Sequence, residues 1–370
     1  MECSRCRRSQ LLAEVSLLAI VSAGCVGPAR SASPGEAVSP VPSSPTLGRI
    51  ALSAYPQDPP SPGFDIFVLN DGGSRLVNLT ASPARDMYPA WSPDREFIAF
   101  CSDQEGPSQI LLIRPDGTDL QPLTQAIDDC GNPSWSTPFW SPDGEWIAIS
   151  SAPGGTYPET PLDIFVIRAD GSEVLNLTSH PASESGASWS LDSTRLALTS
   201  DRDGNEEIYI STIDGSDLTR LTENPARDGA PAWSPDGTRI LFVSDRDGNW
   251  EVYAMNADGT GQTRLTSDPG SDLSPAWSPD GLHIAFTSNR NGNTDLYRMN
   301  SDGSNQINLT NSPENEYWFA WSPDGGRLAL SSCIEECQSS EARWTTSVVR
   351  SDGSSRIEIL GAAASVSWEP

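Results

Sequence analysis

Tryptophan recurs along this chain at a nearly constant spacing, and this repeat restricts the fold more than any other feature. The repeated residues, which are 49, 49, 44, 44, 44 and 47 positions apart, are Trp91, Trp140, Trp189, Trp233, Trp277, Trp321 and Trp368. Two further markers, an Asp-Gly pair and a Leu-Thr pair, recur between them in a fixed order. A repeat of roughly 40–45 residues indicates a solenoid, a propeller or an array of small units.

Each unit reads as four short strands separated by turns. In the unit that begins near Trp233, strands are predicted at 232–234, 240–243, 251–255 and 263–266. Pro235-Asp236-Gly237 and Asp258-Gly259 are turn sequences, because Pro presets φ and Gly takes the positive φ that tight turns need. The pattern predicts an all-β fold, a seven-bladed β-propeller of four-stranded blades.

The two ends of the propeller each supply part of one blade. Residues 50–52, 64–69 and 77–80 read as three strands without a Trp strand, and residues 366–369 read as a Trp strand alone. A single blade cannot bury both of its faces, so the ring has to close. We therefore predict that the C-terminal strand completes the N-terminal blade, and that residues 49–370 form the propeller.

The first 25 residues have the composition of an export signal. Arg5, Arg7 and Arg8 precede an apolar stretch at 11–23, and small residues follow it before Cys25. This order predicts a signal peptide over residues 1–25, either of the lipoprotein type with Cys25 lipidated or simply cleaved. Residues 26–48 are rich in Pro and Ser and are predicted to be a linker. The expected location is periplasmic or at the cell surface, with membrane contact only through the lipid anchor.

The charge of the chain excludes two classes of partner. There are 50 acidic and 23 basic residues, which gives a net charge of −27, and every basic residue is Arg. Binding to nucleic acid needs a basic face that neutralises phosphates, and adsorption to anionic lipid needs the same. We therefore expect no nucleic acid and no direct membrane partner.

The repeated segments resemble the TolB propeller family over roughly residues 49–370. The resemblance lies in Pro-Ala-Trp-Ser-Pro-Asp-Gly, Ser-Asp-Arg-Asp-Gly-Asn and Arg-Leu-Thr, and the best copies are 230–266 and 275–310. It implies a propeller of the periplasm or cell surface that binds other proteins. We expect the protein to be a monomer. Two features differ from the family's namesake, because residues 29–48 are too short for its N-terminal α/β domain and we count seven blades instead of six.

Acidic residues recur five positions before the blade tryptophans. The residues at this position are Asp86, Trp135, Glu184, Asp228, Asp272, Glu316 and Ala363. The first strand of a blade lines the central channel of a propeller, so these residues are predicted to surround one mouth of the channel. Their negative potential would attract a cation or a basic peptide segment. The alternative is that Asp and Glu are merely tolerated in a loop that turns into the first strand.

Aromatic residues near the same position depart from the repeat. Tyr88, Trp135, Tyr317 and Trp318 stand where other blades have small residues, as do Phe139 and Phe319. Exposed aromatic side chains are common anchors of protein interfaces. We therefore predict that some of them contact a partner, and that the others fill the wall of the channel or the core.

Two further groups of residues have a structural and a functional interpretation. Asp201, Asp203, Asp245 and Asp247 place oxygens at alternate positions as calcium loops do, but the twelfth position lacks the acidic ligand, so solvated turns are the favoured interpretation. Cys101, Cys130, Cys333 and Cys337 are an even set in an exported chain, which predicts disulfides. Pairing Cys101 with Cys130 and Cys333 with Cys337 keeps each bridge local and is one of three connectivities.

No catalytic motif and no cofactor site stand out in the sequence. The Gly-x-Ser-x-Gly elbow of propeller-bearing peptidases is missing, and most carboxylates lie in turns that repeat by blade. We predict a non-enzymatic scaffold of the cell envelope that binds a protein or a basic peptide segment at its channel mouth. The alternative is a propeller that binds or cleaves carbohydrate with the acidic and aromatic residues of its funnel.

Overall fold

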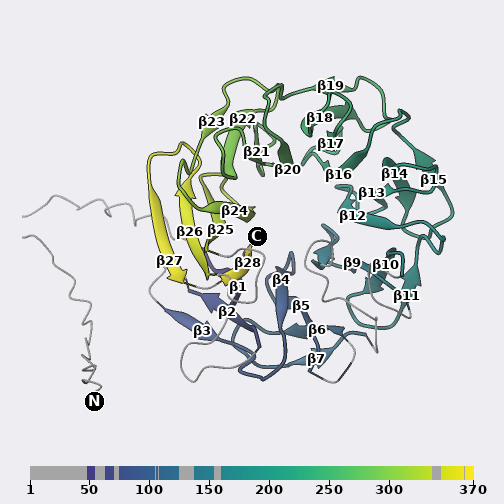
Figure 1. Ribbon diagram of the computed structural model, residues 1–370. Coiled ribbons are helices and arrows are strands. Elements are labelled where there is room, and N and C mark those ends of the chain that lie inside the picture. Colours follow the sequence, from purple (N-terminus) through teal and green to yellow (C-terminus); the bar gives the residue numbers. More distant parts are fainter. Residues whose placement is uncertain are drawn as a thin grey trace, which may run out of the picture. The chain divides into compact units, whose positions relative to one another are not determined.

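The computed structural model describes residues 48–54, 63–70, 75–104, 106, 108–124, 137–153, 160–335, 343–361 and 363–370. The predicted signal peptide, Cys25 and all but the last residue of the predicted linker therefore lie outside the described residues. Residues 45–370 form one unit. Within the described part of this unit, every regular element is a strand, and the strands form seven four-stranded antiparallel sheets arranged in a ring (Figure 1). The prediction of a seven-bladed propeller is confirmed.

We number the blades in chain order and call the strands of each blade first to fourth. The first strands, which surround the axis of the ring in Figure 1, are β4 (Met87–Trp91), β8 (Phe139–Trp140), β12 (Glu184–Trp189), β16 (Asp228–Trp233), β20 (Asp272–Trp277), β24 (Asn315–Trp321) and β28 (Ala363–Trp368). The second strands are β1 (Ile50–Ala54), β5 (Ile98–Ser102), β9 (Trp146–Ser151), β13 (Arg195–Ser200), β17 (Arg239–Ser244), β21 (His283–Ser288) and β25 (Arg327–Glu335).

The third and fourth strands lie progressively farther from the axis of the ring. The third strands are β2 (Asp65–Leu69), β6 (Gln109–Ile113), β10 (Asp163–Arg168), β14 (Glu207–Thr212), β18 (Glu251–Asn256), β22 (Asp295–Asn300) and β26 (Arg343–Arg350). The fourth strands are β3 (Leu76–Asn78), β7 (Gln121–Pro122), β11 (Val174–Asn176), β15 (Leu218–Arg220), β19 (Thr263–Arg264), β23 (Ile307–Asn308) and β27 (Arg356–Gly361).

Closure of the ring follows the prediction. β28 pairs antiparallel with β1, so blade 1 consists of β28, β1, β2 and β3. An ion pair of 2.6 Å between Arg49 Nη2 and Glu369 Oε1 ties the two ends together, and the Arg49 guanidinium also lies 4.7 Å from the centre of the Trp91 ring in blade 2. The last strand of the chain therefore joins blade 1 in the same way as a local hairpin would.

The hydrophobic core lies between neighbouring blades. Phe100, Phe242 and Phe286, each on a second strand, are fully buried and fill these interfaces. The indole of Trp277 reaches the preceding blade and donates a hydrogen bond to the Ala232 carbonyl at 3.2 Å. The equivalent hydrogen bond to the preceding blade is donated by Trp140, Trp189 and Trp321. Four of the seven repeat tryptophans thus link neighbouring blades, whereas Nε1 of Trp91, Trp233 and Trp368 is buried without a hydrogen-bond partner among the described residues. Within the described residues, no helix has the length and hydropathy needed to cross a bilayer.

Candidate functional site

The five acidic residues predicted to surround the channel mouth lie in the interior of the protein. Asp86, Glu184, Asp228 and Asp272 are fully buried, and Glu316 is 1 % exposed. Each stands at the start of a first strand or one residue to either side of it. The prediction that these carboxylates are displayed at the mouth is wrong, and none can contact a partner without rearrangement. Trp135 lies outside the described residues.

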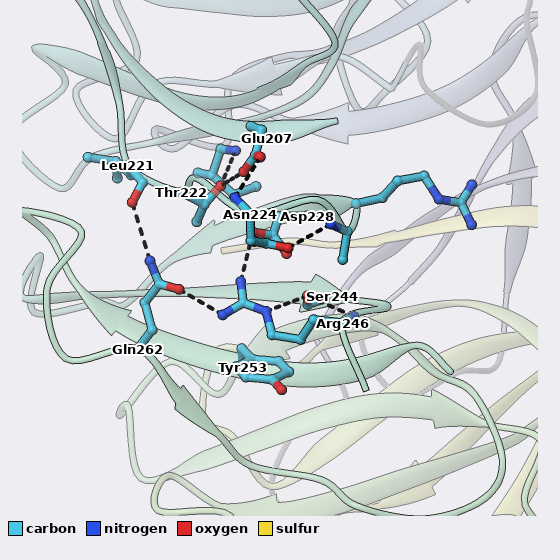
Figure 2. A network of polar contacts seen from close by, with 12 residues as sticks. Glu207, Leu221, Thr222, Asn224, Asp228, Ser244, Arg246, Tyr253 and Gln262 are labelled. Carbon is cyan, nitrogen blue, oxygen red and sulfur yellow. Dashed lines mark hydrogen bonds and ion pairs between the residues drawn. The ribbon is translucent and has the colours of Figure 1, made fainter. Parts of the chain in front are cut away.

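A guanidinium from the next loop explains why a carboxylate is buried at this position. Arg246 Nη2 donates to Asp228 Oδ2 at 2.8 Å, and Nε donates to Ser244 Oγ at 2.8 Å (Figure 2). The same guanidinium bonds Gln262, whose amide reaches the Leu221 carbonyl of blade 4. A buried charge is tolerated when it is paired and hydrogen-bonded. The repeated Asp-Arg-Asp-Gly-Asn loop thus supplies the cation that neutralises the acid and links two blades.

The partner of the buried acid differs from blade to blade. In blades 4 and 6 the loop arginine pairs with the buried acid in the same way as in blade 5. Arg202 pairs with Glu184, and Arg290 pairs with Asp272. Blade 2 has Gln104 instead of the loop arginine, and Asp86 accepts hydrogen bonds from the Ser82 and Ser102 hydroxyls. Burial without a guanidinium raises the pKa of the Asp86 carboxyl above its usual range.

Blade 7 takes its cation from the fourth strand. Arg356, on β27, donates to Glu316 Oε1 at 3.3 Å and to the hydroxyls of Ser332 and Ser347 at 2.9 and 3.2 Å. This pair is longer than those of blades 4 to 6. One carboxylate oxygen of Glu316 is buried without a hydrogen-bond partner among the described residues, as is one oxygen of each acid in blades 4 to 6. Burial raises the pKa of Glu316 to about 7. Glu316 is the buried acid least compensated by its arginine.

A second series of buried polar residues, which was not predicted, stands at the start of the third strands. Thr266 Oγ1 donates to Glu251 Oε2 at 2.6 Å and accepts from the Val252 amide at 2.9 Å. The Thr belongs to the Leu-Thr marker and lies 15 positions after the acid. The residue pairs at this spacing are Asp65 and Thr80, Gln109 and Thr124, Asp163 and Thr178, Glu207 and Thr222, Glu251 and Thr266, and Asp295 and Thr310. That constant spacing is the signal that could have revealed the pairs.

The calcium candidates bind groups of the protein itself. Asp203 and Asp247 each accept a hydrogen bond from a tyrosine hydroxyl and pair with an arginine. Asp201 and Asp245 accept backbone N–H groups of the preceding connection. Among the residues that the structure describes, no three His, Cys, Asp or Glu side chains are grouped as metal ligands. These carboxylate oxygens are engaged by groups of the protein, and the choice between a solvated turn and a calcium loop stays a prediction.

Cys101 and Cys333 are both in disulfide bonds. Cys130 and Cys337, their predicted partners, lie outside the described residues, so the connectivity stays a prediction. Oxidised cysteines in two blades fit the expectation of an exported protein.

The predicted interface aromatics have different surroundings. Tyr88 is buried, with φ of 57° in a bulge of β4. Phe319 is half-buried against the core between blades 6 and 7. Phe139 is 40 % exposed and Tyr317 is 39 % exposed. The last two are therefore accessible to a partner, whereas Tyr88 is part of the core.

Three aromatic side chains of blade 7 pack against one another, and we call Tyr317, Trp318 and Trp344 the blade-7 aromatic cluster. The ring centres of Tyr317 and Trp344 are 5.4 Å apart, those of Trp318 and Trp344 are 5.5 Å apart, and those of Tyr317 and Trp318 are 6.0 Å apart. Trp344 was not among the predicted interface aromatics, because it lies on a third strand 26 positions after Trp318. The structure thus combines two predicted aromatics with one that the repeat did not indicate.

Known proteins share the repeat and the fold. The family model of the TolB beta propeller domain matches residues 133–228 and 222–357. The Tol-Pal system protein TolB of Anaeromyxobacter dehalogenans is 32 % identical over 119 residues, which are 32 % of this chain and 25 % of that protein. The match therefore spans about a quarter of the length of this relative.

Solved structures show the same architecture. TolB from Acinetobacter baumannii superposes with a TM-score of 0.53 at 24 % identity, over 70 % of this chain and 63 % of that one. An oligogalacturonate lyase from Vibrio parahaemolyticus has a TM-score of 0.60 at 15 % identity, over 85 % of each chain. Such identities show the fold alone, and one fold hosts many functions. Since the matched segments together extend over 133–357, well over half of its residues, the chain belongs to the TolB beta propeller domain family.

Proposed function

We propose that this protein is a non-enzymatic, exported propeller that binds a protein of the cell envelope through the blade-7 aromatic cluster. Membership of the TolB beta propeller domain family supports an envelope role, and the relative from Anaeromyxobacter dehalogenans is named for a Tol-Pal system. The aromatic cluster is the observation that carries the proposal, because its exposed Tyr317 packs against the half-buried Trp318 and Trp344, and exposed aromatic residues are common interface anchors.

At the position of the cluster, blade 7 departs from the two blades that precede it. In blades 5 and 6 the two residues after the buried acid are Gly229-Ala230 and Leu273-Ser274, and Ala230 and Ser274 have positive φ in a bulge. In blade 7 the corresponding residues are Tyr317-Trp318, and neither has a positive φ. Neither the scaffold nor the bulge explains two large aromatics here, which favours a role in recognition.

Removal of the exposed ring tests the proposal. Envelope extract is passed over the immobilised protein, a captured protein is purified, and its affinity is then titrated, with the Pal protein of a Tol-Pal system as the first candidate. We expect Tyr317→Ala to weaken binding by roughly tenfold or more, as at an interface hot spot. Leu282→Ala is the matched control, because Leu282 is 61 % exposed but lies in the turn before β21.

Three outcomes contradict the proposal. They are an unchanged affinity of Tyr317→Ala, an equal loss in Leu282→Ala, and binding of a glycan panel in place of any protein. The last outcome would favour the carbohydrate alternative, in which the aromatic rings stack on sugars.

Export and lipidation are part of the proposal and have their own test. The sequence supports them through the basic, apolar and small-residue order that ends at Cys25. We expect Cys25→Ser to move the protein from the membrane fraction to the soluble envelope fraction. An unchanged membrane fraction would refute the lipid anchor and leave the protein-binding proposal intact.

A further inference from the structure

We infer that blade 7 carries an acidic cavity that accepts a lysine or arginine side chain of the partner protein. The cavity has a volume of about 370 Å³ and is lined by Glu314, Thr345, Ser347, Arg356 and Glu358. This size falls near the lower end of the range of small-ligand pockets, roughly 300–1,000 Å³. The inference rests on the proposed partner binding and adds the chemistry of the group that is bound.

The cavity and the aromatic cluster lie on opposite faces of one sheet. Thr345 and Ser347 alternate with Trp344 and Thr346 along β26, and alternate residues of a strand point to opposite faces. The face with Val348 packs against blade 1, and the face with Val349 packs against blade 6. The cavity therefore lies on the blade 6 side, next in sequence to the residues of the cluster.

The guanidinium in the cavity is already engaged. Arg356 donates to Ser332, to Ser347 and to the buried Glu316, which stands directly before Tyr317 in β24. Its contact with Glu314 is long, at 3.8 Å. Because Arg356 neutralises the buried Glu316, little of its positive charge is available to the two carboxylates that line the cavity.

Those two carboxylates are poorly compensated. Glu358 is exposed and makes no ion pair with the described residues, and Glu314 has only the long contact with Arg356. Ionised carboxylates are acceptors only, so they are satisfied by groups rich in N–H donors. An ammonium or guanidinium group fits this lining, because it supplies both the positive charge and the donors.

A metal ion is less suited to the cavity than an organic cation. Among the described residues, no three acidic, His or Cys side chains are grouped as metal ligands. The lining supplies only two carboxylates, fewer than the roughly six to eight oxygen ligands that Ca²⁺ takes, whereas each carboxylate can accept a hydrogen bond from an ammonium or guanidinium group. We therefore commit to a basic side chain of a polypeptide.

Short peptides test the inference without the unidentified partner. The probes are acetyl-lysine methylamide and acetyl-arginine methylamide, with the norleucine and aspartate equivalents as controls, titrated against the full chain by NMR. We expect the basic probes to bind and to lose affinity about tenfold or more in the double variant Glu314→Gln and Glu358→Gln. The matched control is Glu96→Gln, since Glu96 is exposed and lies outside the cavity.

The outcomes separate this inference from the proposed function. Equal binding of the norleucine probe, or an unchanged affinity in the double variant, would overturn the cavity assignment. A partner whose affinity depends on Tyr317 but not on Glu314 and Glu358 would overturn it as well, while leaving the proposed function standing. Basic probes that bind normally while no envelope protein binds would contradict the proposed function alone.

Discussion

Replacing Arg246 by Met removes the cation that compensates a fully buried carboxylate. Met retains much of the aliphatic length of Arg, so the change mainly deletes charge and donors. The substitution removes hydrogen bonds to Asp228 Oδ2 at 2.8 Å, Ser244 Oγ at 2.8 Å and Gln262 Oε1 at 2.9 Å. The guanidinium also lies 4.7 Å from the centre of the Tyr253 ring.

The expected cost follows from burial. Asp228 is fully buried, and the Arg246 side chain is 23 % exposed. Removal of one partner of a buried ion pair costs about 3–5 kcal/mol, because the remaining charge is left without compensation. The partial exposure of Arg246 places the expected loss at the lower end, about 3 kcal/mol. At about 2.1 cal/mol/K of unfolding entropy per residue, that loss corresponds to roughly 4–5 °C in the melting temperature of a unit of about 320 residues.

Denaturant unfolding followed by tryptophan fluorescence measures this loss. The matched control is Arg227→Met, which changes another loop arginine of the same blade. Arg227 forms a 2.9 Å ion pair with Asp245, and its side chain is 54 % exposed. Exposed pairs contribute about 0–1 kcal/mol, so the control should stay close to the parent. The double variant Arg246→Met and Asp228→Asn should cost less than the sum of the two single changes, because it removes the buried charge together with its partner.

The reasoning fails if Arg246→Met costs under 1 kcal/mol or no more than Arg227→Met. Additive single changes would also refute it, since they would show that the two groups do not depend on each other. Either result would mean that Arg246 contributes no more than an exposed surface residue. A role of the buried acids in binding would then have to be considered again.

Three further predictions concern other contacts of the ring. Thr266→Val removes the hydroxyl that bonds Glu251 and the Val252 amide, and should lower the free energy of unfolding in denaturant by about 2–3 kcal/mol. The control Thr263→Val, at an exposed position, should change that free energy by no more than about 0.5 kcal/mol. The pKa of Glu316 is about 7 in the native protein and ordinarily 4.5, so its stabilising contribution is present below pH 4.5 and is lost as the pH rises through 7. Glu316→Gln should therefore reduce the loss of unfolding free energy over this pH range by up to about 3 kcal/mol, measured by unfolding curves at each pH. Ending the chain at Gly361 removes β28 and leaves β1 as an unpaired edge strand. The truncated protein should therefore form dimers or aggregates, which size-exclusion chromatography detects. A monomer with native stability would contradict this account of closure.

The fold could be predicted from the repeat because its markers act locally. Pro-Asp-Gly and Asp-Gly define turns through the φ values of their own residues, and in the turn after Trp233, Asp236 accepts hydrogen bonds from the Ser234 hydroxyl and the Thr238 amide, both two positions away. Such contacts do not depend on the rest of the chain. The four-strand unit, the number of blades and the closure by the last strand could therefore be predicted from the sequence alone.

The candidate site could be predicted only in part, because it depends on contacts distant in sequence. Tyr317 and Trp318 stood out as departures from the repeat, but their third member, Trp344, comes from another strand of the sheet. The cavity likewise depends on Arg356 reaching Glu316, 40 positions earlier, in place of the loop arginine that other blades use. A repeat pattern shows only the residues that recur, so it does not reveal that Arg356 replaces the loop arginine in blade 7.

The recurring acids mark the boundary between the two kinds of information. The sequence by itself determined that a carboxylate stands at the same place in five blades. Only the tertiary structure decided that these carboxylates face guanidinium and hydroxyl groups in the interior instead of the mouth of the channel. The physical reason is that burial and pairing are properties of neighbours in space, and Arg246 becomes a neighbour of Asp228 only when the second strand of the blade brings the loop back beside the first.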